Sequence, residues 1–141
     1  MPLSPRRTGI RIRGHRGHPD VRDALIRYAQ WLRREYDFPI RVPVYLQPGE
    51  YIIADGKQCS AAFFAPFNRN QEPFIRIATG DYSLLQRAEG RDNALASFIV
   101  SMSHEVVHYL QWLDTGDCWE RGVARRAVSM LRRYEKTVER P

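Results

Sequence analysis

The sequence predicts a single α+β domain, in which helical patterns flank a central group of short strands. Its 141 residues are close to the usual size of one domain. No repeat or shift in composition marks a second unit, so we assign residues 1–141 to one domain. Apolar residues recur at helical spacing near both ends of the chain and at strand spacing between them. We therefore expect a small, mostly antiparallel sheet with an N-terminal helix and two C-terminal helices.

The first third of the chain contains two candidate strands around one helix. Residues 1–18 are rich in Arg, Gly and His, a composition that allows a flexible basic N-terminus, and within them Ile10–Arg13 alternates like a short edge strand. His18, followed by proline and aspartate, opens a helix, because proline is tolerated in a first turn. Residues 40–46 alternate weakly, and Pro43 inside them indicates an edge strand.

The rest of the chain continues with strands and then helices. Residues 59–66 and 73–78 are typical of two strands joined by a polar connection. A short helix is expected over residues 82–88, a long one over 92–113 and a last one over about 119–138. The long helix has an apolar stripe at 100° per residue, formed by Leu95, Phe98, Ile99, Met102, Val106, Tyr109, Leu110 and Leu113.

The composition is that of an ordinary globular protein, with 43% apolar and 27% charged residues. No apolar run approaches the roughly 18 residues of a membrane helix, and the basic N-terminus leads into no apolar stretch typical of a secretory signal. The two cysteines, Cys59 and Cys118, are too few for a disulfide framework. We therefore expect a cytoplasmic protein with no membrane partner.

The chain is basic, with 22 Lys+Arg against 16 Asp+Glu and a net charge of +6. This excess keeps nucleic acid open as a partner. No RNP-like segment or zinc-finger spacing accompanies it, so nucleic-acid binding is unsupported by a motif. Solvated, arginine-rich faces explain the same composition.

The long helix contains the pattern H-E-x-x-H, formed by His104, Glu105 and His108. Histidines four residues apart project from one face of a helix and can bind one Zn²⁺ together. Glu105 is turned about 100° from His104, where a general base for metal-assisted hydrolysis is needed. Small residues, among them Ser97 and Ser101, leave room on this face. The alternative is two histidines on a solvated helix face.

A zinc site needs a third protein ligand, and Glu120 is the first candidate. It is the one acidic member of an otherwise apolar or aromatic stripe on the last helix, and a buried charge requires a partner. An acid that only favours the helix dipole is the alternative. Asp114, Asp117 and Cys118 in the connecting loop are further candidates.

These residues resemble the zincin metallopeptidases, and within them the gluzincins, in which H-E-x-x-H is followed by a ligand glutamate on the next helix. In size and layout the chain resembles the minimal gluzincins and the short SprT-like and phage-associated zinc peptidases. The resemblance implies that His104, His108 and Glu120 bind the metal and that Glu105 is the catalytic base. It also implies that substrate lies along the strand before the motif helix, here Phe74–Ala78.

We therefore expect a zinc-dependent metallopeptidase that holds one Zn²⁺ and hydrolyses peptide bonds of a peptide or protein substrate through a metal-bound water activated by Glu105. Two alternatives remain open: a SprT-like DNA-associated protein, and a zinc-stapled binding module without catalysis. The sequence does not resolve the group that stabilises the oxyanion. Tyr82 and Arg76 are candidates, and Tyr109 and Tyr134 fit less well.

Overall fold

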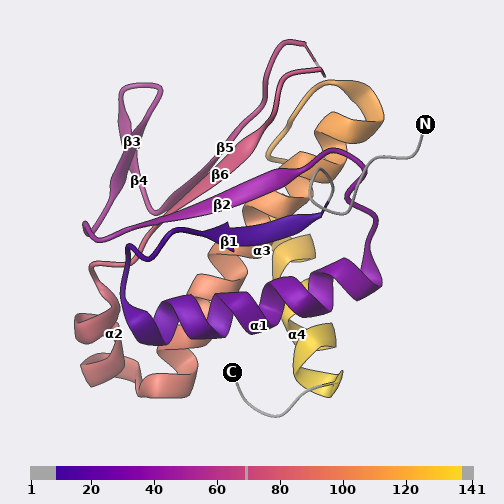
Figure 1. The fold of residues 1–141 in the computed structure, drawn as a ribbon. Coiled ribbons are helices and arrows are strands. Elements are labelled where there is room, and N and C mark those ends of the chain that lie inside the picture. The colour runs from indigo at the N-terminus through magenta and orange to yellow at the C-terminus, as the bar shows by residue number, and fades with distance from the viewer. Residues whose placement is uncertain (1–8, 69, 138–141) are drawn as a thin grey trace.

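The computed structural model describes residues 9–68 and 70–137, and it confirms the α+β class (Figure 1). The strands are β1 (Ile10–Arg13), β2 (Val42–Gln47), β3 (Ile52–Ala54), β4 (Lys57–Cys59), β5 (Ala61–Phe64) and β6 (Phe74–Ala78). The helices are α1 (Pro19–Glu35), α2 (Tyr82–Glu89), α3 (Arg91–Thr115) and α4 (Val123–Thr137).

The main sheet has the strand order β1-β2-β6-β5, and β3 and β4 form a separate antiparallel hairpin. The main sheet is mixed rather than mostly antiparallel. β1 pairs with β2, and β2 with β6, in parallel, whereas β5 and β6 are antiparallel. Helix α1 connects β1 to β2. Because the two strands are parallel, they require a crossover connection of this kind.

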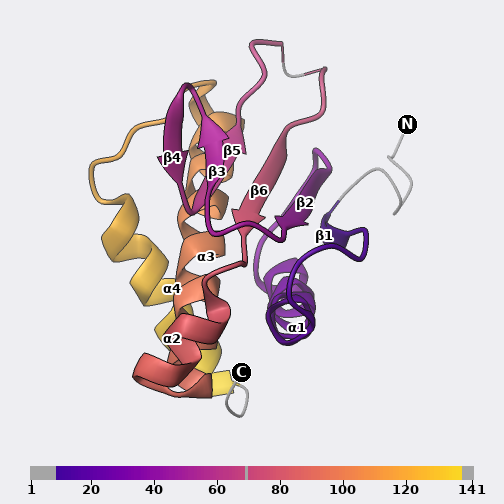
Figure 2. The ribbon, with the colours of Figure 1, turned by 90° about the vertical axis from the view of Figure 1, so that its left-hand side faces the viewer.

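Helices α1 and α3 both lie on one face of the main sheet, the inner face, and the hydrophobic core fills the space between them (Figure 2). Alternate strand residues such as Val44, Ile75 and Ile77 point into this core. Helices α2 and α4 pack against α3. Helix α3 is therefore surrounded by other elements over much of its length, and it carries apolar residues beyond the expected stripe.

Of the two edge strands expected in the first third of the chain, the structure confirms one and contradicts the other. Ile10–Arg13 is an edge strand, as expected, and residues 9–18 are ordered around it; residues 1–8 lie outside the described part. The 40–46 segment is not an edge, because β2 lies between β1 and β6. The N–H of Val42 bonds to Gly9 O on the β1 side, and pairing with β6 begins only at Val44. Pro43 lacks an N–H at a position where neither neighbouring strand requires one.

The helices follow their expected positions closely except at the start of the last one. His18 caps α1, with its Nδ1 accepting from Asp20 N at 3.2 Å. Helix α4 begins at Val123 instead of about residue 119, so the segment 117–122 forms a loop. The expected end at residue 138 lies outside the described residues. None of the described helices has both the length and the apolar character of a membrane span.

Candidate metal centre and its cleft

The two motif histidines lie one turn apart on α3, and their ring centroids are 5.1 Å apart. His108 is buried, whereas His104 is partly exposed. This part of α3 is held in place by Ser103, which directly precedes His104 and whose hydroxyl bonds to the buried Tyr28 hydroxyl of α1. Helix α3 therefore presents both imidazoles from a rigid, well-packed support.

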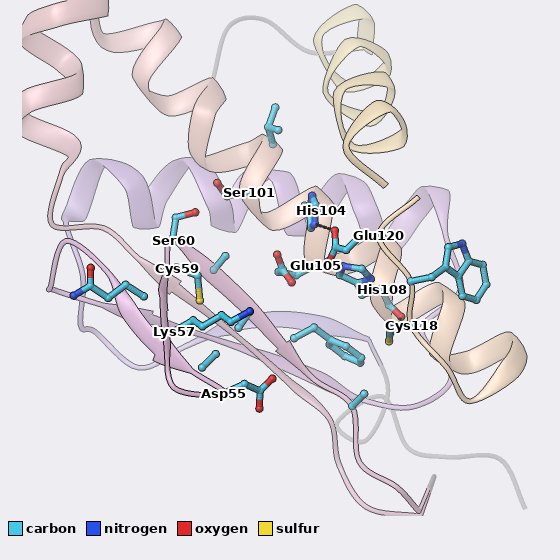
Figure 3. Close-up of a pocket in the computed structure, with 18 residues that line it drawn as sticks. Asp55, Lys57, Cys59, Ser60, Ser101, His104, Glu105, His108, Cys118 and Glu120 are labelled. Atoms are coloured by element: carbon cyan, nitrogen blue, oxygen red, sulfur yellow. Dashed lines mark hydrogen bonds and ion pairs between the residues drawn. The ribbon is translucent and has the colours of Figure 1, made fainter. Parts of the chain in front are cut away.

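Glu120 lies against both histidines (Figure 3). Its Oε2 is 3.0 Å from His104 Nε2, and its Oε1 is 2.8 Å from His108 Nε2. The residue lies in the loop before α4, not on the helix, and its side chain is 75% exposed. The expected buried stripe through Glu120 is therefore wrong. The buried residues of α4 are Val123, Ala127, Met130 and Tyr134.

The loop that carries Glu120 is bounded by two glycines with positive φ, Gly116 at 83° and Gly122 at 80°. Gly116 ends α3 in a left-handed conformation that its lack of a Cβ makes easy. The Thr115 hydroxyl accepts from Asp117 N at 3.1 Å, which tightens the reversal. The chain then runs back along the end of α3 and brings Glu120 to the histidines.

Gln111, one turn after His108, links the loop to that histidine. Its Oε1 accepts the backbone N–H of Trp119 at 3.0 Å and lies 3.0 Å from His108 Nδ1. Because a backbone N–H can only donate, the Gln111 atom is the amide oxygen, and His108 Nδ1 must carry a proton. In the neutral ring, Nε2 then has its lone pair directed at Glu120. Ligand histidines in metal sites are commonly oriented in this way.

The donor set fits a divalent metal ion. The ligand atoms of His104, His108 and Glu120 all lie within 4.8 Å of one another, so this group could hold a metal. Two ligand atoms of a tetrahedral zinc site lie about 3.3 Å apart, close to the 3.0 and 2.8 Å between the Glu120 oxygens and the two histidine Nε2 atoms. The His108 lone pair and a carboxylate oxygen face each other, and a positive charge between them resolves their repulsion.

Glu105 is buried beside this group, with 7% of its surface exposed. Burial raises the pKa of its carboxyl to about 7, and Glu120 adds to this rise, whereas His108 and a backbone hydrogen bond from Phe63 oppose it. The carboxyl group can therefore exchange a proton near neutral pH. The contact with Phe63 also holds it against β5.

A cleft of about 690 Å³ opens in front of these residues. Its walls are β5, the β3–β4 hairpin, α3 and the loop that carries Glu120 (Figure 3). Ser101 lines it, as expected, but Ser97 does not. Small side chains on β5 and next to it, including Ala61 and Ala62, leave the space open. The cleft is large enough for several residues of an extended peptide.

The edge of the sheet next to the cleft is β5. The expectation that Phe74–Ala78 forms this edge is wrong, because β6 lies between β2 and β5. Ser60 O accepts from Ala78 N on the β6 side, so the alternating backbone groups of Ala61 and Phe63 face away from β6. Periodicity within a strand reveals its faces but not its neighbours.

Most of the other candidate residues lie elsewhere. Asp114 and Asp117 are exposed and do not line the cleft, whereas Cys118 does, with its Sγ 3.5 Å from His108 O. The four oxyanion candidates lie outside the cleft lining. Tyr82 bonds to Asp20, Arg76 to Ile53 O and Tyr109 to Ile40 O, while Tyr134 packs against Tyr28 and Trp31.

Sequence reasoning missed two residues of the site. Gln111 had a usable signal, because its i+3 spacing from His108 places both on one side of the helix. Lys57 reaches into the cleft from β4, and among the described lining residues it is the one lysine or arginine (Figure 3). The Asp55-Gly56 turn just before it predicts a tight hairpin, but not the direction in which the hairpin folds.

No family model matches the chain, and comparisons with curated proteins and with solved structures find no match either. The chemistry of the site therefore has to be argued from its own geometry.

Proposed function

We propose that the protein is a zinc-dependent metallopeptidase of the zincin type. The observation that carries the proposal is the convergence of His104, His108 and Glu120, with Glu105 beside them in an open cleft. A metal that only links two segments of the fold would not need a buried carboxyl group with a pKa near 7, or an unpaired strand edge, beside it. Both features support catalysis over a purely structural role.

The chemically active groups of the cleft have separate roles in this proposal. Zinc held by the two histidines and Glu120 would polarise the scissile carbonyl and lower the pKa of water. Glu105 accepts a proton at its carboxylate and returns it to the leaving amine. The outward-facing backbone groups of Ala61 and the carbonyl oxygen of Phe63 bind the substrate as an added strand, while the Phe63 N–H remains bonded to Glu105. The Lys57 ammonium stabilises negative charge that develops on the carbonyl oxygen.

Metal binding is the first test. The purified chain, incubated with zinc and freed of excess, should retain about one Zn²⁺, and His104→Ala or His108→Ala should abolish this uptake. Glu120→Ala should weaken zinc binding by more than about 100-fold. Loss of a residue that only hydrogen-bonds to a ligand already lowers metal affinity by up to that factor. Asp117→Ala is the matched control and should bind zinc as the wild type does. A chain that takes up no zinc would overturn the proposal.

Catalysis is tested by Glu105→Gln, which keeps the shape of the side chain and removes its basicity. Digestion of a mixed peptide library, followed by mass spectrometry, should show cleavage by the zinc-loaded wild type. The variant should retain zinc and lose cleavage by at least about 100-fold. Glu89→Gln, at the exposed end of α2, controls for the loss of charge. Zinc uptake without any cleavage by the wild type would identify a zinc-stapled binding module instead.

A further inference from the structure

The outer face of the main sheet, opposite α1 and α3, is not covered by any of the described helices (Figure 2). Strand register places Tyr45 beside Arg76, and Phe64 beside Phe74, on this face. Arg13, on β1, is the partner of Tyr45 on the other side. The face is thus formed by side chains of all four strands.

Three aromatic rings form a continuous row across β2, β6 and β5. The rings of Phe64 and Phe74 are stacked, with centroids 4.9 Å apart, and Tyr45 meets Phe74 edge-on at 6.1 Å. Tyr45 is 38% exposed and Phe64 is 47% exposed. Large aromatic side chains on an exposed sheet face are costly in water unless they have a partner. Their flat faces suit planar ligands.

The charged residues of the four strands are all positive. Arg11, Arg13 and Arg76 belong to the four strands, and none of the strand residues is acidic. Arg11 and Arg13 are exposed, and Arg76 is held by Ile53 O of the hairpin at 3.0 Å. Arginine guanidinium groups bind phosphates in a bidentate manner and stack on aromatic rings.

A second hollow of about 330 Å³ lies between the hairpin tip and this face, and it shares Asp55 and Phe63 with the lining of the cleft. Phe64, Phe74 and Arg76 line it from the sheet, and Asp55 lines it from the hairpin turn. It thus offers an aromatic floor, a cation and a carboxylate acceptor. A nucleobase can stack on the phenyl rings and donate an amino hydrogen to Asp55.

We propose that this outer face binds single-stranded nucleic acid. Bases stack on Tyr45, Phe74 and Phe64, and the arginines hold the phosphates. The face lies on the other side of β5 and β6 from the core, and it uses none of the candidate metal ligands. Nucleic-acid binding therefore does not require zinc, although the hollow adjoins the cleft.

The experiment measures fluorescence anisotropy of a labelled oligodeoxythymidine of about 12 nucleotides, within the site sizes usual for such surfaces, titrated with the full chain. Binding should be saturable and should weaken as salt rises. The double variant Tyr45→Ala/Phe64→Ala should bind about tenfold more weakly or worse. Tyr45→Trp/Phe64→Trp should restore binding, because it keeps the stacking surfaces. If the double alanine variant does not fold, Tyr45→Ala alone provides the same test.

The arginines are tested against a matched pair on another surface. Arg11→Gln/Arg13→Gln should weaken binding and reduce the salt slope by about 1.4, the value for two single-strand phosphate contacts. Arg125→Gln/Arg132→Gln removes the same charge from the exposed side of α4 and should leave binding unchanged. The proposal would be overturned if both arginine pairs lost affinity equally, or if the alanine variant kept full affinity. It would also be overturned if the wild type did not bind the oligonucleotide at low salt. So would preferential binding of an unlabelled peptide or of a second copy of the chain to this face.

Discussion

His108 Nδ1 lies 3.0 Å from Gln111 Oε1, and the same oxygen accepts the Trp119 N–H of the loop that carries Glu120. One buried amide thus sets the tautomer of a candidate ligand and fastens the segment that supplies another. Its influence on metal affinity should be large for a residue outside the motif, because outer-shell hydrogen bonds orient the ligand ring.

Gln111→Met keeps the length of the side chain but removes the acceptor. We expect zinc affinity to fall about 10- to 100-fold, as is usual when an outer-shell partner of a ligand histidine is lost. Competition with a chromophoric chelator measures the change. Gln86→Met, on the exposed side of α2, is the control and should bind zinc as tightly as the wild type. Unchanged affinity in Gln111→Met would show that the ring does not depend on this amide.

At the scale of single residues, the motif was predictable because helix geometry alone puts His104 and His108 on one side. Glu105 was predictable as their neighbour, but its near-neutral pKa was not, because that depends on burial by distant segments. Glu120 was selected on a helical stripe that does not include it. The residue does lie with the histidines, but a loop brings it there.

The element that positions Glu120 is the loop between Gly116 and Gly122. Residues 119–122 of this loop were assigned to the last helix because Glu120 and the later apolar residues share helical spacing. Gly122, at φ 80°, interrupts that helix, and Val123 N instead bonds to Glu120 O at 3.0 Å in a turn. A glycine next to a periodic pattern signals a boundary more reliably than the period itself.

Gly122→Ala tests whether this turn controls the metal site. A Cβ there meets no atom within 4 Å, so the cost arises from the positive φ, about 1–2 kcal/mol. Gly14→Ala, at φ 74° and equally open, provides the same kind of backbone strain after β1. Thermal melts should show similar losses of stability, while only Gly122→Ala should weaken zinc binding. Equal zinc affinities of the two variants would show that the metal site does not depend on the conformation of this loop.

Strand order was the least predictable feature of the elements. Alternation separates the residues of β6 into two faces, but the pairing partner of each strand depends on the path of the whole chain. β5 lies within the strand expected over residues 59–66, but its sequence did not indicate that it forms the edge next to the cleft. Pro43 misled for a related reason, since it lies beyond the residues of β2 that pair with β6.

At the scale of the whole molecule, the candidate metal site joins α3 to the chain segment that leads into α4. A metal bound there holds these parts together in the folded state and has no comparable site in the unfolded chain. The overall class was predictable from the order of the helical and strand patterns. The mixed character of the sheet was not, because parallel pairing follows from the crossover through α1.

Zinc should therefore raise the melting temperature of the protein. At a free concentration 100-fold above Kd, binding stabilises the folded state by about 2.7 kcal/mol, enough for a shift of several degrees. Calorimetry with zinc and with excess chelator measures this difference. In His108→Ala the two melts should coincide. If zinc does not change the melting temperature of the wild type, the folded protein does not form the site.

The exposure of Glu120 also has a kinetic consequence. Two of the three candidate ligands are carried by a rigid, packed helix, but the third lies on a solvent-facing loop between two glycines. Small movements of such a loop cost little and can occur without unfolding the core. A metal held here would exchange with the solution by swinging one carboxylate aside, so the lifetime of the loaded state would be set by the loop and not by global stability.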